Sequence, residues 1–545
     1  MINIMYIINE SQFGGAALSL FDVLEIGKER LNPTVIIPST GEIQERLEQL
    51  HIKYYIVSFK LNYGAIGVHT VMEADRAFVS NYNAALKLQK IIKKEKIQLI
   101  HTNSSVSNVG ELAATIAGIP HVWHIREFME EDFGIEFLDK KLQIELLECS
   151  DMIITISECV RDNFMRKYGI DSVCIHNGIG AERFYCEDFT TKCKNSFMMA
   201  GTIIPAKGQL DAVRAVNELV KQGLDVRLYI IGSSVSYQYM WILHKFIRQC
   251  GLESSVYIFP FRNDLSELRK NCQYSITGSR MEALGRVTIE AMLAGCVVIG
   301  ADSGGTAEII GHDSERGYLY EQGNYKDLAR VMLYALEHTE NNPAIQEKAQ
   351  SYALEEFDTV KYLENIINIY KNVIENRRAD LSEKRIKLLE KIKTRYLQTE
   401  GIMNCEEKAE EVMDEKERKL QEIKELWLND REKEISVDRT LIKKGIQTVA
   451  IYGMGYLGCH LYDELENSEI DIKYVMDREL EDLAGVLRVI KLDGELPEVD
   501  AVVVTVLGDT NRICNSIRRK CSYKILTLTE VLRWCKEENN GEQDK

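Results

Sequence analysis

The stretch SRMEALGRVTIEAMLAGCVVIGADSGGTAE, residues 279–308, decides the fold of the segment around it. It predicts a loop, a helix that opens at Gly285-Arg286, a short strand over residues 296–299 and a glycine-rich turn. Gly295 suits the end of the helix, because glycine adopts the left-handed conformation without a side-chain penalty. The apolar strand is typical of one that is covered on both faces. The stretch therefore predicts an α/β unit with parallel strands.

The start of this helix is a candidate binding site. The first amides of a helix lack partners and carry the positive end of its dipole, so Gly285 and Arg286 are expected to attract an anion. Glu282 and Glu290 lie on either side of that start. On a continuous helix they would be turned by about 80° and separated by roughly 12 Å, so we expect them to have different roles. An ordinary solvated helix with two surface glutamates is the alternative.

The pattern of two glutamates with seven residues between them, followed by EAMLAG, a strand and SGG, resembles the retaining glycosyltransferases of family 4, which have the GT-B fold. The resemblance covers roughly residues 1–375 and implies two Rossmann-like domains that face a cleft. It implies that Glu282 contacts the transferred sugar as a catalytic residue and that Glu290 binds the donor ribose. The amides at Gly285 and Arg286 would face the donor diphosphate.

Two glycine pairs are predicted to border the donor as well. Gly304 and Gly305 have no side chain, so their backbone can approach a ligand closely. Near the N-terminus, a strand over residues 2–8 precedes Gly14 and Gly15 at the start of a helix, an arrangement that cradles phosphates. The resemblance places this second pair beneath the donor diphosphate, and a tight turn without a ligand is the alternative.

A predicted strand over residues 197–200 leads into GTIIPAKGQ. In the resembled family this segment usually carries an arginine directly after the first glycine and then lysine-glycine, with both cations on the diphosphate. Lys207 matches the lysine, whereas Thr202 stands where the arginine is expected. The resemblance thus implies a catalytic, phosphate-binding Lys207. The second phosphate contact is either lost or supplied from elsewhere, by Arg280 or Arg286. An exposed lysine at a helix cap is the alternative.

Strands and helices alternate through the first third of the chain, which predicts a parallel sheet with ligands beyond the carboxyl ends of its strands. The resemblance implies that His124 faces the donor sugar as a catalytic residue; a histidine that fixes its own loop is the alternative. His101, Asn103 and Arg126 are expected on the acceptor side. Arg126 is expected to pair either with a phosphate or with the neighbouring Glu127.

The chain divides into four predicted parts. Residues 1–190 form an N-terminal Rossmann-like domain on the acceptor side, which a helix over residues 355–375 completes. Residues 191–354 form the domain that binds the nucleotide sugar. Residues 376–440 are charged, and they are expected to form a helical or coiled-coil linker that can join two copies of the chain. Its basic first part is expected to be a solvated helix face.

Residues 441–545 are predicted to form a small Rossmann-like domain. Gly453, Gly455 and Gly458 lie between a strand and a helix, and Asp477 ends the next strand, which is the dinucleotide fingerprint. A second site for a nucleotide or dinucleotide is therefore expected here. The domain has no Tyr-x3-Lys pair, so binding without redox chemistry, or a docking role, is favoured over catalysis. A structural fold without a ligand is the alternative.

The composition limits the kinds of partner that this chain is expected to bind and the compartment in which it is expected to work. A net charge of −17 over 545 residues argues against nucleic acid as a partner. Thirteen cysteines without a CxxC pair, and a start without a signal-peptide pattern, favour the reducing cytoplasm. No apolar run is long enough to span a bilayer, so at most peripheral contact with the inner face of a membrane is expected.

Together these features predict a retaining transferase that moves a sugar from a nucleoside-diphosphate sugar to a hydroxyl of a glycan or lipid-linked glycan, in bacterial surface polysaccharide synthesis. No Asp-x-Asp motif occurs, so transfer is expected to need neither a metal nor another cofactor. A sugar-nucleotide epimerase of the same fold and a non-catalytic scaffold of a polysaccharide pathway are the alternatives. The donor sugar, its base, the acceptor and the linkage leave no readable pattern.

Overall fold

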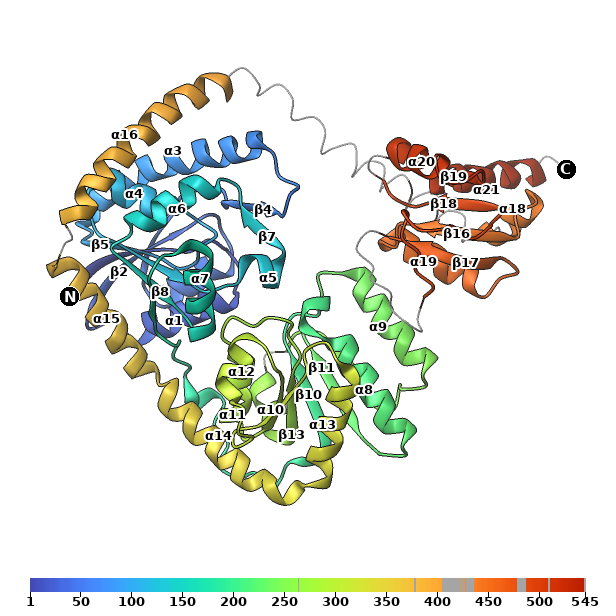
Figure 1. Ribbon diagram of the computed structural model, residues 1–545, viewed down its shortest axis with the longest axis horizontal. Coiled ribbons are helices and arrows are strands. Elements are labelled where there is room, and N and C mark those ends of the chain that lie inside the picture. Colours follow the sequence, from blue (N-terminus) through green and yellow to red (C-terminus); the bar gives the residue numbers. More distant parts are fainter. Residues whose placement is uncertain are drawn as a thin grey trace. The chain divides into compact units, whose positions relative to one another are not determined.

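The structure is a computed structural model that describes residues 1–262, 264–376, 379–403, 423, 427, 436–477, 487–507 and 510–543. Its contacts divide the chain into two compact units (Figure 1). The first comprises Met1–Ser233 and Ser254–Cys405, and the second comprises Ser234–Glu253 and Glu406–Lys545. A segment from the middle of the chain therefore belongs to the same unit as the C-terminal part.

The first unit contains two parallel sheets, of which the N-terminal one has the strand order β3-β2-β1-β5-β6-β8-β9. Its strands are β1 (Ile2–Ile7), β2 (Leu31–Ile37), β3 (Lys53–Ile56), β5 (Leu99–Thr102), β6 (His121–Ile125), β8 (Met152–Thr155) and β9 (Val173–Cys174). Its helices are α1 (Gly15–Ile26), α2 (Glu42–Gln49), α3 (Val71–Glu95), α4 (Val109–Ala117), α5 (Met129–Phe133), α6 (Lys140–Cys149) and α7 (Glu158–Tyr168). A separate antiparallel pair joins β4 (Tyr63–Ala65) to β7 (Ile135–Phe137). These elements form the N-terminal lobe.

The second sheet of the first unit has the strand order β12-β11-β10-β13-β14-β15. Its strands are β10 (Cys193–Ala200), β11 (Arg227–Ile231), β12 (Val256–Phe259), β13 (Cys272–Thr277), β14 (Val297–Ala301) and β15 (Tyr318–Tyr320). Its helices are α8 (Gln209–Lys221), α10 (Leu265–Asn271), α11 (Arg286–Leu293), α12 (Gly304–Ile310), α13 (Tyr325–Glu337) and α14 (Asn342–Glu356), with short 3-10 turns η1 (Ala181–Arg183), η2 (Pro205–Lys207) and η3 (Thr339–Asn341). These elements form the second lobe.

The stretch over residues 279–308 folds as its sequence predicts. It supplies the helix α11, the fully buried strand β14 and the start of α12. Gly295 follows α11 with a φ of +67°, and a Cβ there would lie 2.2 Å from the ring of Phe189. Glycine is thus required at this position by both backbone conformation and space. The predicted α/β fold with two Rossmann-like domains is confirmed.

Two helices that follow the second lobe pack on the N-terminal lobe. α15 (Thr359–Glu375) buries one apolar face in the same core as β1 and α1. The hydroxyl of its Tyr370 lies 3.1 Å from that of Tyr6 in β1. α16 (Ala379–Met403) then packs against α3, α4 and α6 (Figure 1).

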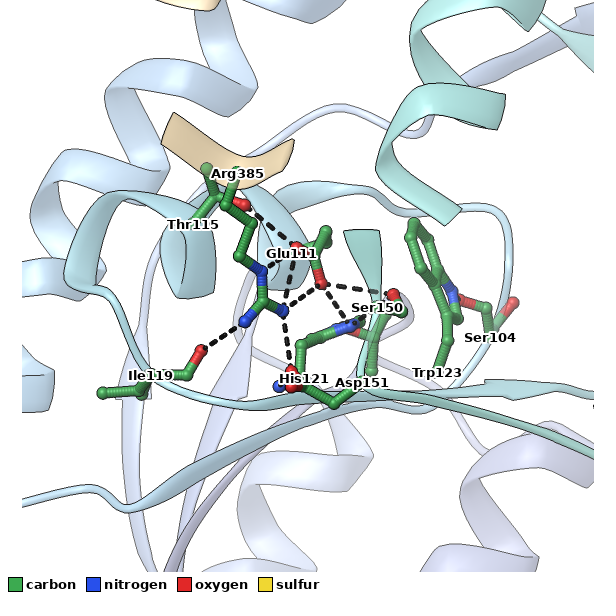
Figure 2. Close-up of polar contacts among 10 residues, drawn as sticks. Ser104, Glu111, Thr115, Ile119, His121, Trp123, Ser150, Asp151 and Arg385 are labelled. Carbon is green, nitrogen blue, oxygen red and sulfur yellow. Dashed lines mark hydrogen bonds and ion pairs between the residues drawn. The ribbon is translucent and has the colours of Figure 1, made fainter. Parts of the chain in front are cut away.

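Arg385 of α16 enters the core of the N-terminal lobe, as Figure 2 shows. Its Nη2 atom lies 3.2 Å from Glu111 Oε1 and 2.8 Å from Asp151 Oδ2. The second oxygen of Glu111 lies 2.8 Å from Nδ1 of His121. Burial alone would raise the pKa of Glu111, but Arg385 and His121 outweigh burial and lower that pKa. Glu111 is therefore a carboxylate held in the core by its partners.

The position of Arg385 corrects one prediction. A solvated helix face was expected over the basic residues after 376. Lys384, Lys387, Lys391 and Lys393 are exposed as expected, whereas Arg385 is only 7% exposed and Leu388 is buried on the same side of α16. The error arises because the charged partners of Arg385 come from α4 and from the residue before β8, far away in the sequence. Most of the remaining linker, residues 404–435, lies outside the described residues, so the dimer seam stays a prediction.

The second unit has a parallel sheet with the strand order β17-β16-β18-β19. Its elements are α9 (Tyr237–Gln249), α18 (Val437–Lys443), β16 (Thr448–Tyr452), α19 (Tyr456–Glu466), β17 (Asp471–Met476), β18 (Ala501–Val504), α20 (Thr510–Arg518), β19 (Lys524–Thr527) and α21 (Leu528–Gln543). α9 and α19 are joined by polar contacts. The indole of Trp241 donates to both oxygens of Asp463 at 2.8 and 2.9 Å, and the buried Lys245 lies 2.5 Å from Glu466.

Candidate active site

The backbone conformation at the start of α11 depends on a glycine. Gly285 is its N-cap residue with a φ of +90°, a conformation that a residue with a Cβ rarely adopts. Among the residues that the structure describes, no oxygen accepts from the amides of Gly285, Arg286 or Val287. These amides and the dipole of α11 present partial positive charge at one point, which suits an anion.

Lys207 and Glu282 meet, although they are 75 residues apart in the sequence. Lys207 Nζ lies 2.8 Å from Glu282 Oε2, and the Ser279 hydroxyl donates to the same oxygen at 2.6 Å. Burial disfavours the charged form of Lys207, but Glu282 and Asp132 outweigh burial and raise the pKa of Lys207. The lysine therefore stays cationic next to the loop that precedes α11.

Close backbone packing holds these two loops together. Arg280 N donates to Ala206 O at 2.8 Å. A Cβ at Gly208 would lie only 2.4 Å from the carbonyl oxygen of Gly278. Arg280 thus lies beside the Lys207 segment, and its side chain is exposed. Thr202, which stands where the family usually has arginine, is exposed as well.

Asp132 of α5 is a site residue that the sequence did not reveal. It comes from the N-terminal lobe, yet Lys207 and Glu282 of the second lobe lie near enough for their charges to act on it. Burial, helped by Glu282 and opposed by Lys207, raises the pKa of Asp132 to about 6. It belongs to the run MEEDF, in which nothing distinguishes it from its two acidic neighbours. Only the tertiary fold selects it.

Glu290 lies in a network of charges on α11. Its carboxylate pairs with the buried guanidinium of Arg269, and its Oε1 atom lies 3.1 Å from Arg286 Nε. Arg286 also reaches the N-terminal lobe, where its Nη1 atom lies 3.0 Å from Asp22 Oδ2 in α1. Arg286 therefore connects the two lobes through its side chain, while its backbone amide stays at the helix start.

Gly304 and Gly305 pack against protein backbone. A Cβ at Gly304 would lie 2.5 Å from the carbonyl oxygen of Glu282, and one at Gly305 would lie 2.6 Å from Leu284 Cα. Gly305 N also donates to Glu282 O at 2.7 Å. What these glycines approach in this structure is the Glu282 loop itself, and they fix its position.

A polar cluster lies at the carboxyl ends of β5 and β6. Asn103 donates to Ala16 O at 2.9 Å, which ties it to the start of α1, and it accepts from Arg126 Nε at 2.9 Å. Arg126 also donates to Asn177 Oδ1 at 2.8 Å. Although Arg126 is only 7% exposed, it forms no ion pair with any described residue. The carboxylates of Glu127 and Glu10 nevertheless lie near enough for their charges to act on Arg126, which belongs to the same cluster as the start of α1.

The glycines at the start of α1 differ from each other. A Cβ at Gly14 would lie 2.6 Å from a carboxylate oxygen of Glu10, which closes that side of the turn. At Gly15 a Cβ would meet nothing within 4 Å. Open space is thus found beside Gly15 and not beside Gly14.

His101 and His124 lie in the core. His124 has no exposed surface, and its Nδ1 atom lies 3.2 Å from Arg126 Nη2. His101 Nδ1 lies 2.8 Å from the hydroxyl of Tyr370. Burial, together with the charge of Arg126, lowers the pKa of both rings well below the usual value. Both histidines are therefore neutral. His124 lies within β6, and Arg126 is the first residue after the carboxyl end of that strand.

The predicted second nucleotide site is partly closed by its own backbone. Gly453 has a φ of +94°, and a Cβ at Gly458 would lie 1.9 Å from Gly453 O. Asp477 Oδ2 accepts from Met454 N at 2.6 Å, so this carboxylate already holds the glycine turn. Gly455 has open space around it.

His176 connects the two lobes through hydrogen bonds. Its two ring nitrogens lie 2.8 Å from Glu308 Oε1 in α12 and 2.8 Å from Glu356 Oε1 in α14. Glu308 in turn accepts from the amides of Glu158 and Cys159 at the start of α7, at 3.1 and 3.0 Å. Burial would lower the pKa of His176, but hydrogen bonds to Cys174 and to the two carboxylates outweigh it and raise that pKa to about 11.

We expect His176→Gln to lower stability most at mildly acidic pH. Because the folded pKa exceeds the ordinary value, the stabilisation is complete below about pH 6.5 and is lost as pH rises towards 11. Urea unfolding should show a deficit of about 1–2 kcal/mol at pH 6.5 that shrinks by pH 9.5. His312→Gln, at a mostly exposed ring, is the control. A deficit that grows with pH would contradict this assignment.

Two Rossmann-like lobes, with Lys207 and Glu282 of one next to Asp132 of the other, define a two-lobed transferase of the GT-B class. The model of Glycosyltransferase Family 4 matches residues 13–183, and that of Glycosyl transferases group 1 matches residues 189–352. Together they cover more than half of the 545 residues. The chain belongs to the family 4 glycosyltransferases.

Individual relatives agree with this assignment. An uncharacterized glycosyltransferase, MJ1178 of Methanocaldococcus jannaschii, is 23% identical over 366 residues, which are 63% of this chain and 98% of the relative. The UDP-Gal:alpha-D-GlcNAc-diphosphoundecaprenol alpha-1,3-galactosyltransferase of Escherichia coli is 21% identical over 326 residues, 55% of this chain and 82% of the relative. The crystal structure of Anabaena HepE with UDP and glucose has a TM-score of 0.57 and 23% identity, and it covers 68% of this chain and 100% of its own.

Proposed function

We propose that this chain transfers a glycosyl group from a nucleoside-diphosphate sugar to a hydroxyl of a glycan or lipid-linked glycan, with retention at the anomeric carbon. The observation that carries the proposal is the meeting of Lys207 and Glu282 beside the unpaired amides of α11. A cation, an acceptor of sugar hydroxyl bonds and a helix dipole thus lie at one place. A diphosphate with an attached sugar presents the complementary groups.

The chemical task is to separate charge. As the glycosidic bond to the diphosphate breaks, the leaving oxygen gains negative charge and the sugar becomes oxocarbenium-like. Lys207 and the amides of Gly285 and Arg286 would stabilise the leaving diphosphate, which is commonly the largest electrostatic contribution to such a reaction. Glu282, held by Lys207 and Ser279, would orient the sugar. No enzymic nucleophile is assigned, and attack on the same face as the leaving group accounts for retention.

The remaining donor contacts follow from the charge network. Glu290 would accept from the ribose hydroxyls after exchanging its Arg286 contact, because one of its oxygens stays paired with Arg269. Gly15 offers open space at the start of α1. Arg126, with no ion-pair partner among the described residues, would add positive charge on the acceptor side, next to Asn103.

The names of the relatives support a particular kind of donor and acceptor. The Escherichia coli relative is named for a UDP-sugar donor and a diphosphoundecaprenol-linked acceptor, and the HepE crystals hold UDP and glucose. We therefore favour a UDP-sugar donor, a lipid-linked acceptor and work at the cytoplasmic face of a membrane in surface polysaccharide synthesis. Of the described helices, none has the length and apolarity needed to cross a bilayer.

Turnover with defined substrates tests the proposal. UDP-, GDP- and ADP-sugars are first screened by thermal shift, because a ligand that binds the folded state raises the melting temperature. The stabilising donor is then incubated with a diphosphoundecaprenol-linked sugar, with and without EDTA. We expect an α-linked product from an α-linked donor, at a rate that EDTA does not change. An isomerised donor would establish an epimerase instead, and binding without turnover would establish a scaffold.

Asp132 predicts the pH dependence of transfer. Its pKa of about 6 means that the carboxylate is charged above pH 6 and neutral below it. A carboxylate with this pKa, across from Lys207, suits removal of a proton from the acceptor hydroxyl. We expect kcat/KM for the acceptor to fall on the acid side with an apparent pKa near 6. Asp132→Asn should be slower and should lose this acid limb, whereas Glu131→Gln should keep it.

A further inference from the structure

The second unit contains a pocket of about 520 Å³ at the carboxyl ends of β16 and β17. Its volume lies within the range of about 300–1,000 Å³ that is typical of small-molecule sites. Ligands of open parallel sheets bind at this edge. The lining residues are Tyr452, Met476, Asp477, Lys491, Leu492, Asp493, Ser516, Arg519 and Lys520.

The floor of the pocket is apolar. Tyr452 and Met476 end the two strands and are 4% and 1% exposed. They belong to the core that α20 covers, so the pocket opens on the α20 face of the sheet. Leu492 lies beside them. An aromatic ring and a polarizable thioether together form a surface that suits a flat aromatic ring.

The rim of the pocket is cationic. Lys491, Arg519 and Lys520 line it and outnumber the one acidic residue of the rim, Asp493, whose backbone oxygen accepts from Lys520 Nζ at 3.2 Å. Lys491 and Arg519 form no ion pair with the described part of the chain. Two exposed cations without partners, in a chain of net charge −17, favour an anionic ligand. Asp477, at the floor, would accept from hydroxyl groups.

We propose that this pocket binds a nucleotide that carries at least two phosphates. Its base lies on Tyr452 and Met476, its ribose faces Asp477, and its phosphates contact Lys491 and Arg519. The site differs from the glycine-turn site expected from the sequence, because it opens towards α20 and not at the start of α19. It is also separate from the donor site at Lys207, since all of its lining residues belong to the second unit.

The test uses the full chain with the donor site disabled, so that binding reports this pocket alone. ADP and UDP are titrated by calorimetry into Lys207→Ala/Glu290→Gln protein, in which the glutamine can still accept from the buried Arg269. We expect one saturable site for at least one of them. Adding Lys491→Ala and Arg519→Ala should weaken it at least tenfold, and raising the salt from 50 to 300 mM should weaken it further. Both replaced side chains are exposed, so the thermal unfolding profile should not change.

Arg518→Ala is the matched control. It lies next to Arg519 on the same helix and bonds to Asn515 without lining the pocket, so it should change the affinity less than twofold. The proposal is overturned if neither nucleotide saturates a site, or if the Lys491 and Arg519 variants leave the affinity unchanged. It is overturned equally if inorganic pyrophosphate binds as tightly as the nucleotide. Transfer by otherwise wild-type Lys491→Ala/Arg519→Ala protein reports the donor site, so the two proposals fail separately.

Discussion

Lys207→Ala should lower kcat for glycosyl transfer by about 100- to 1,000-fold, the usual effect of removing one fixed electrostatic contact to a leaving group. Lys207 holds its positive charge within 2.8 Å of Glu282 and beside the start of α11. Negative charge on the diphosphate is greatest in the transition state, so the loss should fall mainly on kcat and less on the donor KM. Steady-state kinetics with the donor found by thermal shift measures this split.

Two further variants show whether charge or geometry matters. Lys207→Arg keeps the charge but changes its shape and reach, so it should recover only part of the rate. Lys221→Ala, at the exposed end of α8, should behave as wild type. Removing Lys207 also leaves the Glu282 carboxylate without its cation. Glu282→Gln is therefore measured in parallel, so that the two effects can be separated. If Lys207→Ala retains transfer within threefold of wild type, the leaving group does not dock at this lysine.

Arg385→Met should destabilise the first unit by about 3–5 kcal/mol, because it leaves a buried carboxylate without its cation. Glu111 is fully buried, and Arg385 and His121 are what keep its pKa low. The measurement is the change in urea-unfolding free energy of the full chain, followed by a signal from Trp123, which lies in this core. Lys387→Ala, on the exposed side of the same helix, should cost less than about 0.5 kcal/mol.

A second substitution distinguishes ion pairing from packing. In Arg385→Met/Glu111→Gln protein the fully buried carboxylate is neutralised as well, and only Asp151, which still accepts from His121 N, loses its cation, so most of the lost stability should return. The cluster also depends on pH in a defined direction. Because the folded pKa of Glu111 is lowered, its stabilisation is present at neutral pH and is lost as pH falls through the folded value. A double variant as unstable as the single one would show that the Arg385 side chain acts by packing alone.

Local patterns in the sequence were sufficient to predict much of the first unit. The helix start at Gly285, its end at Gly295 and the buried strand β14 all follow from residue types within one stretch. The two parallel sheets follow from the alternation of apolar strands and helices. Such features depend on the backbone preferences and burial of neighbouring residues, which the sequence displays directly.

Contacts between distant residues needed the tertiary structure. The sequence indicated a close backbone approach at Gly304 and Gly305, but only the structure shows that the Glu282 loop packs against them; their contact with a donor stays a prediction. It treated the start of α16 as solvated, because nothing near Arg385 reveals Glu111 and Asp151. Asp132 was indistinguishable from its acidic neighbours until the fold placed it near Lys207.

The sequence by itself determined the family, the two-sheet architecture and the identity of Lys207, Glu282 and Glu290 as candidates, since each belongs to a motif of consecutive residues. Tertiary structure alone decided which charges meet, which histidines are buried and where the C-terminal domain has an open pocket. The physical reason is that a carboxylate or cation acts through its distance, burial and neighbours. Those quantities are set by chain segments that lie far apart in the sequence.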